Sequence, residues 1–259
     1  MRTFFTVLGF LYLGFGLEAQ KSLPIAENVI KNAQEIWLDD YGNVYLLNTK
    51  ELNFSKYDSL GNKKGELLWA VPFHVQSVDN PLTLSLFSAN SQELRFVDQN
   101  LTDIQDPVHF TQNFAHIKAV YVEDLQYIWI VDDVQKKLSK LDYRNRNIIQ
   151  SYLINEDFND LKNFIVYENR IYLNKGTNFE VIDLKGNQLY STGLDGDLLY
   201  LNRENKNILL FFSNKVLSYK SSETLNSLFD VPSAKAIGGN YKNWVVIERN
   251  KLYLYPRKK

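Results

Sequence analysis

Three pairs of carboxylates are the residues in this sequence best suited to chemistry. They are Asp132 with Asp133, Glu156 with Asp157, and Asp195 with Asp197. Paired carboxylates can bind Ca²⁺ or divide the roles of general acid and general base between them. None of the pairs lies in a calcium-loop spacing of the D-x-D-x-D-G type. Aspartate also favours turns, because its side chain accepts hydrogen bonds from nearby backbone amides, and we prefer this local interpretation.

Histidine and cysteine add little to this set. The chain has three histidines and no cysteine. We expect His74 in a junction between strand units, within reach of the same face as the carboxylates, and His109 in an outer strand. His116 completes the set, and a packed or solvent-facing role is the default for each. No G-x-G-x-x-G, G-x-S-x-G or H-E-x-x-H motif occurs, so we predict no catalytic residue, no metal site and no cofactor.

The elements that must position these residues form a repeat. Six hairpin-like units recur along the chain, each made of two apolar arms of five to seven residues around a polar turn. Their second arms end at Asp58, Asp98, Asp142, Asp183, Lys220 and Pro256, which are 40, 44, 41, 37 and 36 residues apart. A period near 40 residues is what four short strands and their turns occupy.

The same alignment predicts the other strands. The first arms lie at 44–47, 82–87, 127–131, 170–173, 208–212 and 244–247. Inner strands are expected at 36–38, 117–122, 164–166 and 198–201, and outer strands at 66–71, 148–153 and 224–229. No long segment shows a helical period of apolar residues. The last unit lacks its outer strand, and residues 22–26 are a spare strand that can pair with 252–255 and leave no bare edge. We therefore predict an all-β, six-bladed β-propeller of four-stranded antiparallel blades, closed by an N-terminal strand in the last blade.

The first 19 residues are expected to be a signal peptide. Arg2 precedes an uncharged apolar run at 3–17, and cleavage is expected after Ala19. The run is short for a membrane span, although an N-terminal anchor is the alternative interpretation. The prediction is a signal peptide at 1–19, a single propeller domain at 20–259 and no transmembrane segment after cleavage. A periplasmic location follows, with an extracellular one as the alternative.

Composition limits the class of partner. Lys and Arg number 29 and Asp and Glu 30, for a net charge of -1. Nucleic-acid binding proteins usually carry a clear basic excess, so we predict no nucleic-acid partner.

The motif Asp39-x-x-Gly42-Asn43-Val44-Tyr45, followed by Lys56-Tyr57-Asp58-x-x-Gly61, resembles the repeats of β-propeller proteins, notably the NHL and related six-bladed classes. The resemblance covers essentially the whole mature chain. Propellers host hydrolases, lyases, lectin-like binders and scaffolds, so it implies the fold and leaves function open. The size, blade style and a signal ending in Ala19-Gln20 also resemble the periplasmic propellers of bacteria with type nine secretion, one class of which plugs the periplasmic mouth of the outer-membrane translocon.

In a propeller, the loops between the two middle strands and the loops between blades form the upper face. The candidate contact residues on that face are His74, Asp132, Asp133, Glu156, Asp157, Lys175, Asp195, Asp197 and Arg249. Such mixed charge suits a protein partner. The predicted function is non-enzymatic binding to an envelope or outer-membrane protein complex, plugging or assisting a translocon. The alternatives are a metal-dependent hydrolase or lyase and a glycan-binding module. Trp69, in an outer strand, is expected to be exposed at a contact surface.

Overall fold

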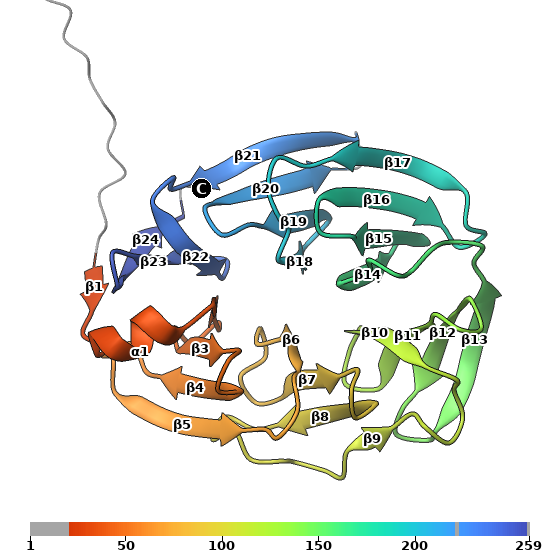
Figure 1. Cartoon of the computed structure of the whole chain (residues 1–259), viewed down its shortest axis with the longest axis horizontal. Helices are drawn as coiled ribbons and strands as arrows, with labels where there is room; N and C mark the ends of the chain where they lie inside the picture. The colour runs from red at the N-terminus through yellow and green to blue at the C-terminus, as the bar shows by residue number, and fades with distance from the viewer. Residues whose placement is uncertain (1–20, 221–222, 258–259) are drawn as a thin grey trace, which may run out of the picture.

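The computed structural model describes residues 21–220 and 223–257. Within them, the chain forms six four-stranded antiparallel sheets arranged as blades around a ring (Figure 1). Blade 1 contains β2 (Glu35–Leu38), β3 (Val44–Asn48), β4 (Asn53–Tyr57) and β5 (Lys63–Leu68); blade 2 contains β6 (His74–Ser77), β7 (Leu84–Ser88), β8 (Glu93–Val97) and β9 (Val108–His109); blade 3 contains β10 (Ile117–Val122), β11 (Tyr127–Asp132), β12 (Lys137–Asp142) and β13 (Asn147–Leu153). Blade 4 contains β14 (Asn163–Tyr167), β15 (Arg170–Asn174), β16 (Asn178–Asp183) and β17 (Gln188–Gly193); blade 5 contains β18 (Tyr200–Glu204), β19 (Asn207–Phe211), β20 (Lys215–Lys220) and β21 (Thr224–Asp230); blade 6 contains β22 (Ala234–Gly239), β23 (Asn243–Glu248) and β24 (Lys251–Pro256), followed by β1 (Lys21–Leu23). The predicted six-bladed β-propeller is confirmed.

The core lies between neighbouring blades. The second strand of each blade is largely buried, which explains continuous apolar runs such as those of β3, β11 and β23. In the seam between blades 1 and 2, the ring of Phe54 packs edge-on against Trp37 and Phe73. The outermost strands face solvent; β13 is exposed at six of its seven residues.

The ring closes as the sequence predicted, through its N-terminal strand. β1 runs antiparallel to β24, with Leu23 opposite Leu252, and both side chains are buried in the same cluster. The strand covers Lys21–Leu23 and not the expected 22–26. A short helix, α1 (Glu27–Asn32), follows it and buries Ile30; six residues are too few to show a helical period in the sequence.

An aspartate turn repeats at the blade ends. Asp39 accepts hydrogen bonds from the backbone amides of Tyr41 and Asn43, and Gly42 between them has φ +84°. The same two-amide pattern is made by Asp58, Asp98 and Asp183. This turn explains the Asp-x-x-Gly motif. The aspartate carboxylate accepts hydrogen bonds from backbone amides that have no strand partner in the turn, and glycine adopts the left-handed backbone conformation without strain.

The sequence predicts an N-terminal signal peptide and no transmembrane segment after its cleavage. The proposed signal peptide at 1–19 lies outside the described residues. Within the described part, no helix is long and apolar enough to cross a membrane.

Candidate binding site at the upper mouth of the axial channel

The first residues of the inner strands meet at one end of the axial channel. Every blade runs from its inner strand outward, so the inner strands point the same way around the ring. The starts of the inner strands of blades 1 to 5 enclose a cavity of about 740 Å³ whose polar lining includes Glu35, His74, His116, Lys162 and Tyr200. We call this cavity the upper mouth. It places ionisable groups from different blades in one solvent-filled space.

Glu35, at the start of β2, is the most perturbed carboxyl in the upper mouth. The surrounding channel walls raise the pKa of Glu35 to about 7, although the positive charge of Lys162 acts in the opposite direction. A carboxyl with this pKa exchanges its proton near neutral pH, which is a property that general acids and bases share.

Lys162 is anchored by a residue that the sequence had singled out. Its Nζ atom lies 2.6 Å from Oδ1 of Asp197, which belongs to the junction between blades 4 and 5. The surrounding channel walls, and secondarily the charge of Lys162, lower the pKa of His74, although its side chain faces the open cavity. His74 is therefore predominantly a neutral imidazole at neutral pH.

His116 is held in the same way from blade 3. Its Nδ1 atom lies 2.8 Å from Oδ1 of Asp133, in the loop between β11 and β12. Asp133 thus orients an imidazole at the upper mouth. Its neighbour Asp132 turns inward, is buried, and accepts hydrogen bonds from the backbone amides of Ala115, Val134 and Gln135. Asp133 therefore acts at the cavity, whereas Asp132 stabilises the loop between β11 and β12.

Aromatic residues mark the waist of the channel. Tyr200 lines both the upper mouth and a second cavity of about 300 Å³ below it. The ring of Tyr200 lies 5.9 Å from Trp37 and stacks on Phe211 at 4.4 Å. Burial raises the pKa of Tyr200 well above its ordinary value, and the carboxyls of Glu35 and Asp79 act in the same direction. The Tyr200 phenol remains protonated and can donate a hydrogen bond into the channel.

The other predicted face residues lie apart from this cavity. Lys175 sits between two carboxylates, 2.7 Å from Glu156 and 2.7 Å from Glu180, and forms a local network. Asp157 accepts a hydrogen bond from the amide of Asn159.

Two further candidates are weakly held. Asp195 is fully exposed, 3.8 Å from Lys215, and Arg249 is largely exposed, 3.7 Å from Glu248. Of the nine candidates, only His74 lines the upper mouth, while Asp133 and Asp197 act there through His116 and Lys162.

Within the described residues, no group of three or more His, Cys, Asp or Glu side chains is placed to hold a metal ion. Asp132 and Asp157 accept hydrogen bonds from nearby backbone amides, whereas Asp133 and Asp197 contact side chains that are distant in the sequence. Trp69 corrects another expectation: it is buried against Phe73, with the Arg95 guanidinium over its ring, and is not an exposed platform.

The sequence reasoning missed Glu35, His116, Lys162 and Tyr200 as cavity residues. A signal for three of them existed. Glu35, His116 and Lys162 each stand within two residues before the first apolar residue of an inner strand, and in a ring all such positions converge. These residues stand at the starts of the inner strands, whereas the predicted contact residues are those of the loops.

Comparison with known proteins supports the fold. No protein-family model and no curated protein matches this sequence. A streptogramin B lyase structure matches with a TM-score of 0.54 and 14% identity, covering 88% of this chain and 84% of that one. A catalytically inactive histidine-to-alanine variant of virginiamycin B lyase from Staphylococcus aureus, solved with quinupristin, gives 0.55 and 12%, covering 92% and 88%. The Pan2 WD40 domain of Neurospora crassa gives 0.54 and 7%, covering 88% and 89%. At such low identities these likenesses show the fold alone, and the chain is a six-bladed β-propeller.

Proposed function

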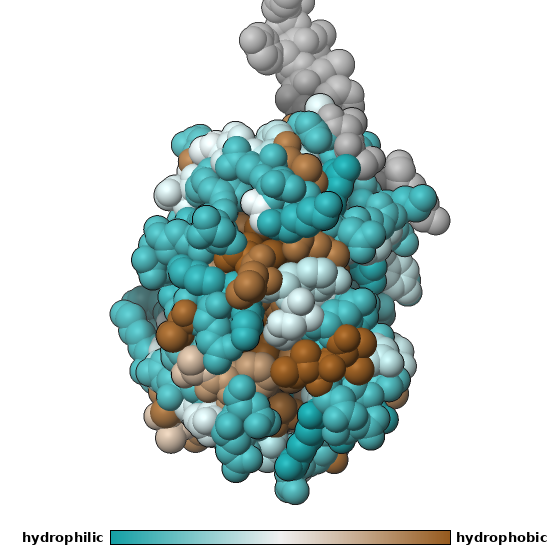
Figure 2. Space-filling model, turned by 90° about the vertical axis from the view of Figure 1, so that its right-hand side faces the viewer, coloured by the Kyte–Doolittle hydropathy of each residue, from teal (hydrophilic) through white to brown (hydrophobic). Residues whose placement is uncertain are grey.

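We propose that this chain is a non-enzymatic, exported propeller that binds a protein complex of the bacterial envelope through the rim of blade 3. The observation that carries the proposal is an apolar strip on that rim. We call it the rim strip and define it as Val134, Ile148, Ile149, Leu153 and Leu189. Figure 2 shows apolar side chains gathered on this side of the ring. Contiguous exposed apolar surface on a soluble protein marks interaction sites.

The rim strip is built by β13 and its neighbours. The pairing of β12 with β13 has a bulge at which Ile149 is opposite no residue, so Ile148 and Ile149 both face solvent. Leu153, at the end of β13, is 72% exposed, and Val134, in the loop between β11 and β12, is 67% exposed. A strand that exposes so many aliphatic side chains gains stability by covering them with another protein.

The class of partner rests on the export prediction and on the balanced charge of the chain. The export prediction favours an outer-membrane complex, the balanced charge argues against nucleic acid, and the resemblance to periplasmic propellers makes a protein-secretion translocon the specific case. The opposite charges of the exposed Asp195 and Arg249 side chains offer polar contacts in addition to the rim strip.

An affinity pull-down from detergent-solubilised envelope tests the proposal. The tagged chain is compared with an Ile149→Asp, Leu153→Asp variant and with a control carrying Leu60→Asp and Leu228→Asp, which are exposed on blades 1 and 5. We expect stoichiometric recovery of an envelope protein by the parent and the control, and loss with the rim variant. Equal recovery by all three chains, or recovery of the chain alone, would contradict the proposal.

A second candidate function is recognition of a small polar ligand, such as a glycan, in the upper mouth. Trp37 and Tyr200 in contact beside the ionisable Glu35 favour it, because sugars bind aromatic rings flanked by hydrogen-bonding groups. Tryptophan fluorescence measured during titration with envelope glycans tests this candidate. A saturable change that a Tyr200→Ala variant loses would support it, and an unchanged spectrum would exclude the glycans tested.

A further inference from the structure

Blade 2 has an unusually short outer strand. β9 is two residues long, whereas the outer strands of blades 1, 3, 4 and 5 have six or seven. The segment before β9 crosses β8 as a loop, tied by the Val97 to Asp103 bridge and by the hydrogen bond from the Ile104 amide to the Phe96 carbonyl. The shortened strand leaves the rim between blades 2 and 3 unfilled.

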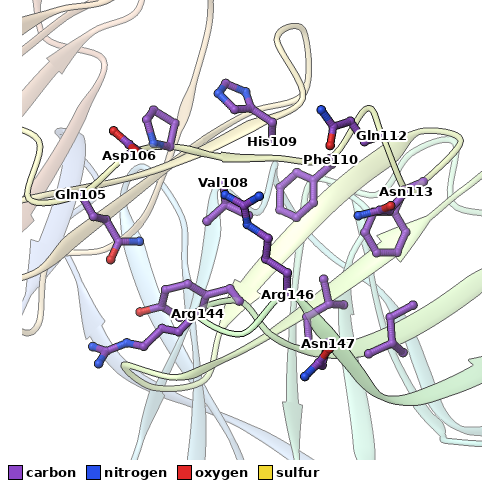
Figure 3. Close-up of a pocket in the computed structure, with 15 residues that line it drawn as sticks. Gln105, Asp106, Val108, His109, Phe110, Gln112, Asn113, Arg144, Arg146 and Asn147 are labelled. Atoms are coloured by element: carbon purple, nitrogen blue, oxygen red, sulfur yellow. The ribbon is translucent and has the colours of Figure 1, made fainter.

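A groove of about 880 Å³ occupies this rim (Figure 3). Its buried apolar lining includes Phe110, Leu141 and Tyr143. On the blade 3 side, the turn between β12 and β13 contributes Arg144 and Arg146. In Figure 3 the Arg146 side chain points from this turn toward the β9 side of the groove. The groove therefore has an apolar floor and a basic wall.

The two guanidinium groups have no partner within the described residues. No ion pair or side-chain hydrogen bond there includes Arg144 or Arg146, whereas Arg95 and Arg257 are each paired with a glutamate. Asp106 is the acidic residue of the lining, on the opposite wall. Two free guanidinium groups beside an apolar floor match carboxylates, which they can bind in bidentate fashion.

The turn that carries the arginines is held firmly. Asp142 accepts hydrogen bonds from the Asn145 amide at 3.0 Å and from the Gln126 side chain at 2.9 Å. The Tyr143 hydroxyl donates to the Leu125 carbonyl at 2.7 Å. Such a preformed turn lowers the entropy cost of binding at its arginines.

Next to the groove, β13 has an unpaired edge. Among the described strands it pairs with β12 and with no strand on its outer side. Its free N–H and C=O groups can hydrogen-bond an added strand. The groove and this edge are continuous, because Asn147 and Ile148 belong to both.

We propose that this groove binds an extended acidic segment of the partner protein, added as a strand along β13 with its carboxylates on Arg144 and Arg146. The inference deepens the proposed function and rests on it, because it names the part of the partner that reaches the rim of blade 3. The charge of the groove selects acidic side chains, and the strand edge selects an extended backbone.

The test uses synthetic peptides as probes. A fluorescein-labelled octapeptide of alternating Val and Glu is compared with Val-Gln and Val-Lys peptides of the same length, by fluorescence polarisation. We expect saturable binding of the Val-Glu peptide, at least tenfold weaker for an Arg144→Gln, Arg146→Gln chain and for a peptide N-methylated at alternate residues. A Lys185→Gln, Lys206→Gln chain removes the same charge from exposed turns of blades 4 and 5 and should bind as the parent does.

Three results would overturn the inference: equal binding of the three peptides, undiminished binding by the Arg variant, or equal binding of a charge-matched oligothymidylate. Both arginines are exposed, so unchanged circular dichroism and melting temperature should accompany the substitutions. Envelope capture separates the two proposals. Capture that depends on Leu153 but not on Arg144 and Arg146 would leave the proposed function standing and remove this inference.

Discussion

The carboxylate of Asp197 lies 2.6 Å from Nζ of Lys162, and this ion pair holds a cation in the cavity that contains the Glu35 carboxyl. The positive charge of Lys162 lowers the pKa of Glu35, but burial raises it by more. A carboxyl that is protonated near neutral pH results from this competition.

Stability should fall as pH rises through the titration of Glu35. The native state holds this proton up to about pH 7, whereas the unfolded chain releases it near 4.5. The folded protein therefore binds more protons between these values, and the free energy of unfolding decreases by up to about 3 kcal/mol across the range, less where channel water screens the charge. Urea unfolding from pH 4 to 8.5 measures the slope.

Glu35→Gln isolates the contribution of this carboxyl. The variant should lose this part of the slope and be more stable than the parent at pH 8, while Glu51→Gln, at an exposed turn, should leave the slope unchanged. An identical slope in the parent and the Glu35→Gln protein would show that Glu35 titrates normally.

Asp132 and Asp133 should differ sharply when replaced by alanine. Asp132→Ala leaves three backbone amides in the blade 3 loop without their acceptor and should cost about 3 kcal/mol of unfolding free energy. Asp133→Ala breaks one partly exposed contact to His116 and should cost less than about 1 kcal/mol. Chemical denaturation compares them, and equal losses would refute the division of roles.

Gly238 is required where blade 6 meets blade 1. A Cβ atom at this position would lie 2.4 Å from the Ile36 carbonyl oxygen on β2. Gly238→Ala should therefore push two inner strands apart and cost about 3 kcal/mol. Gly193→Ala is the matched control, because a Cβ there has no neighbour within 4 Å, and its effect should stay below about 1 kcal/mol. Thermal melts of both variants give the comparison, and similar melting temperatures would contradict the prediction.

A charge in the closing strand should open the ring. Leu23→Asp buries a carboxylate against Leu252 and should cost about 4 kcal/mol, with aggregation as the β24 edge becomes available. Ser22→Asp adds the same charge at an exposed neighbour and should change stability by less than about 0.5 kcal/mol. Light scattering during heating distinguishes them; a Leu23→Asp chain that melts as the parent does would argue against closure by β1.

The sequence predicted the blades well because each blade is a local pattern. The strands at 117–122 and 127–131 follow from apolar runs and turns that lie next to each other in the chain, and observed β10 and β11 match them closely. The sequence predicts the inner strand of blade 5 at 198–201, whereas β18 begins at Tyr200. Leu198 is a buried apolar residue in the junction before β18. The pattern of apolar residues in the sequence does not distinguish it from a strand residue.

The site was harder to predict because it is not local. Glu35 looks like a turn residue in sequence, and only the ring brings Lys162 and His74 near it. The groove by Arg146 was missed for another reason. It exists because β9 is short, and a missing strand leaves no pattern to find.

The pairing of β1 with β24, where Leu23 lies opposite Leu252, closes the ring through few backbone contacts. It rests on three residue pairs, whereas the neighbouring pairing of β23 with β24 has six. It also joins the described strands that lie farthest apart in the chain, so no local turn guides its formation. The last strand to dock during folding should therefore be β1, and the first excursions of the native ring should be its fraying from β24, with five blades still intact.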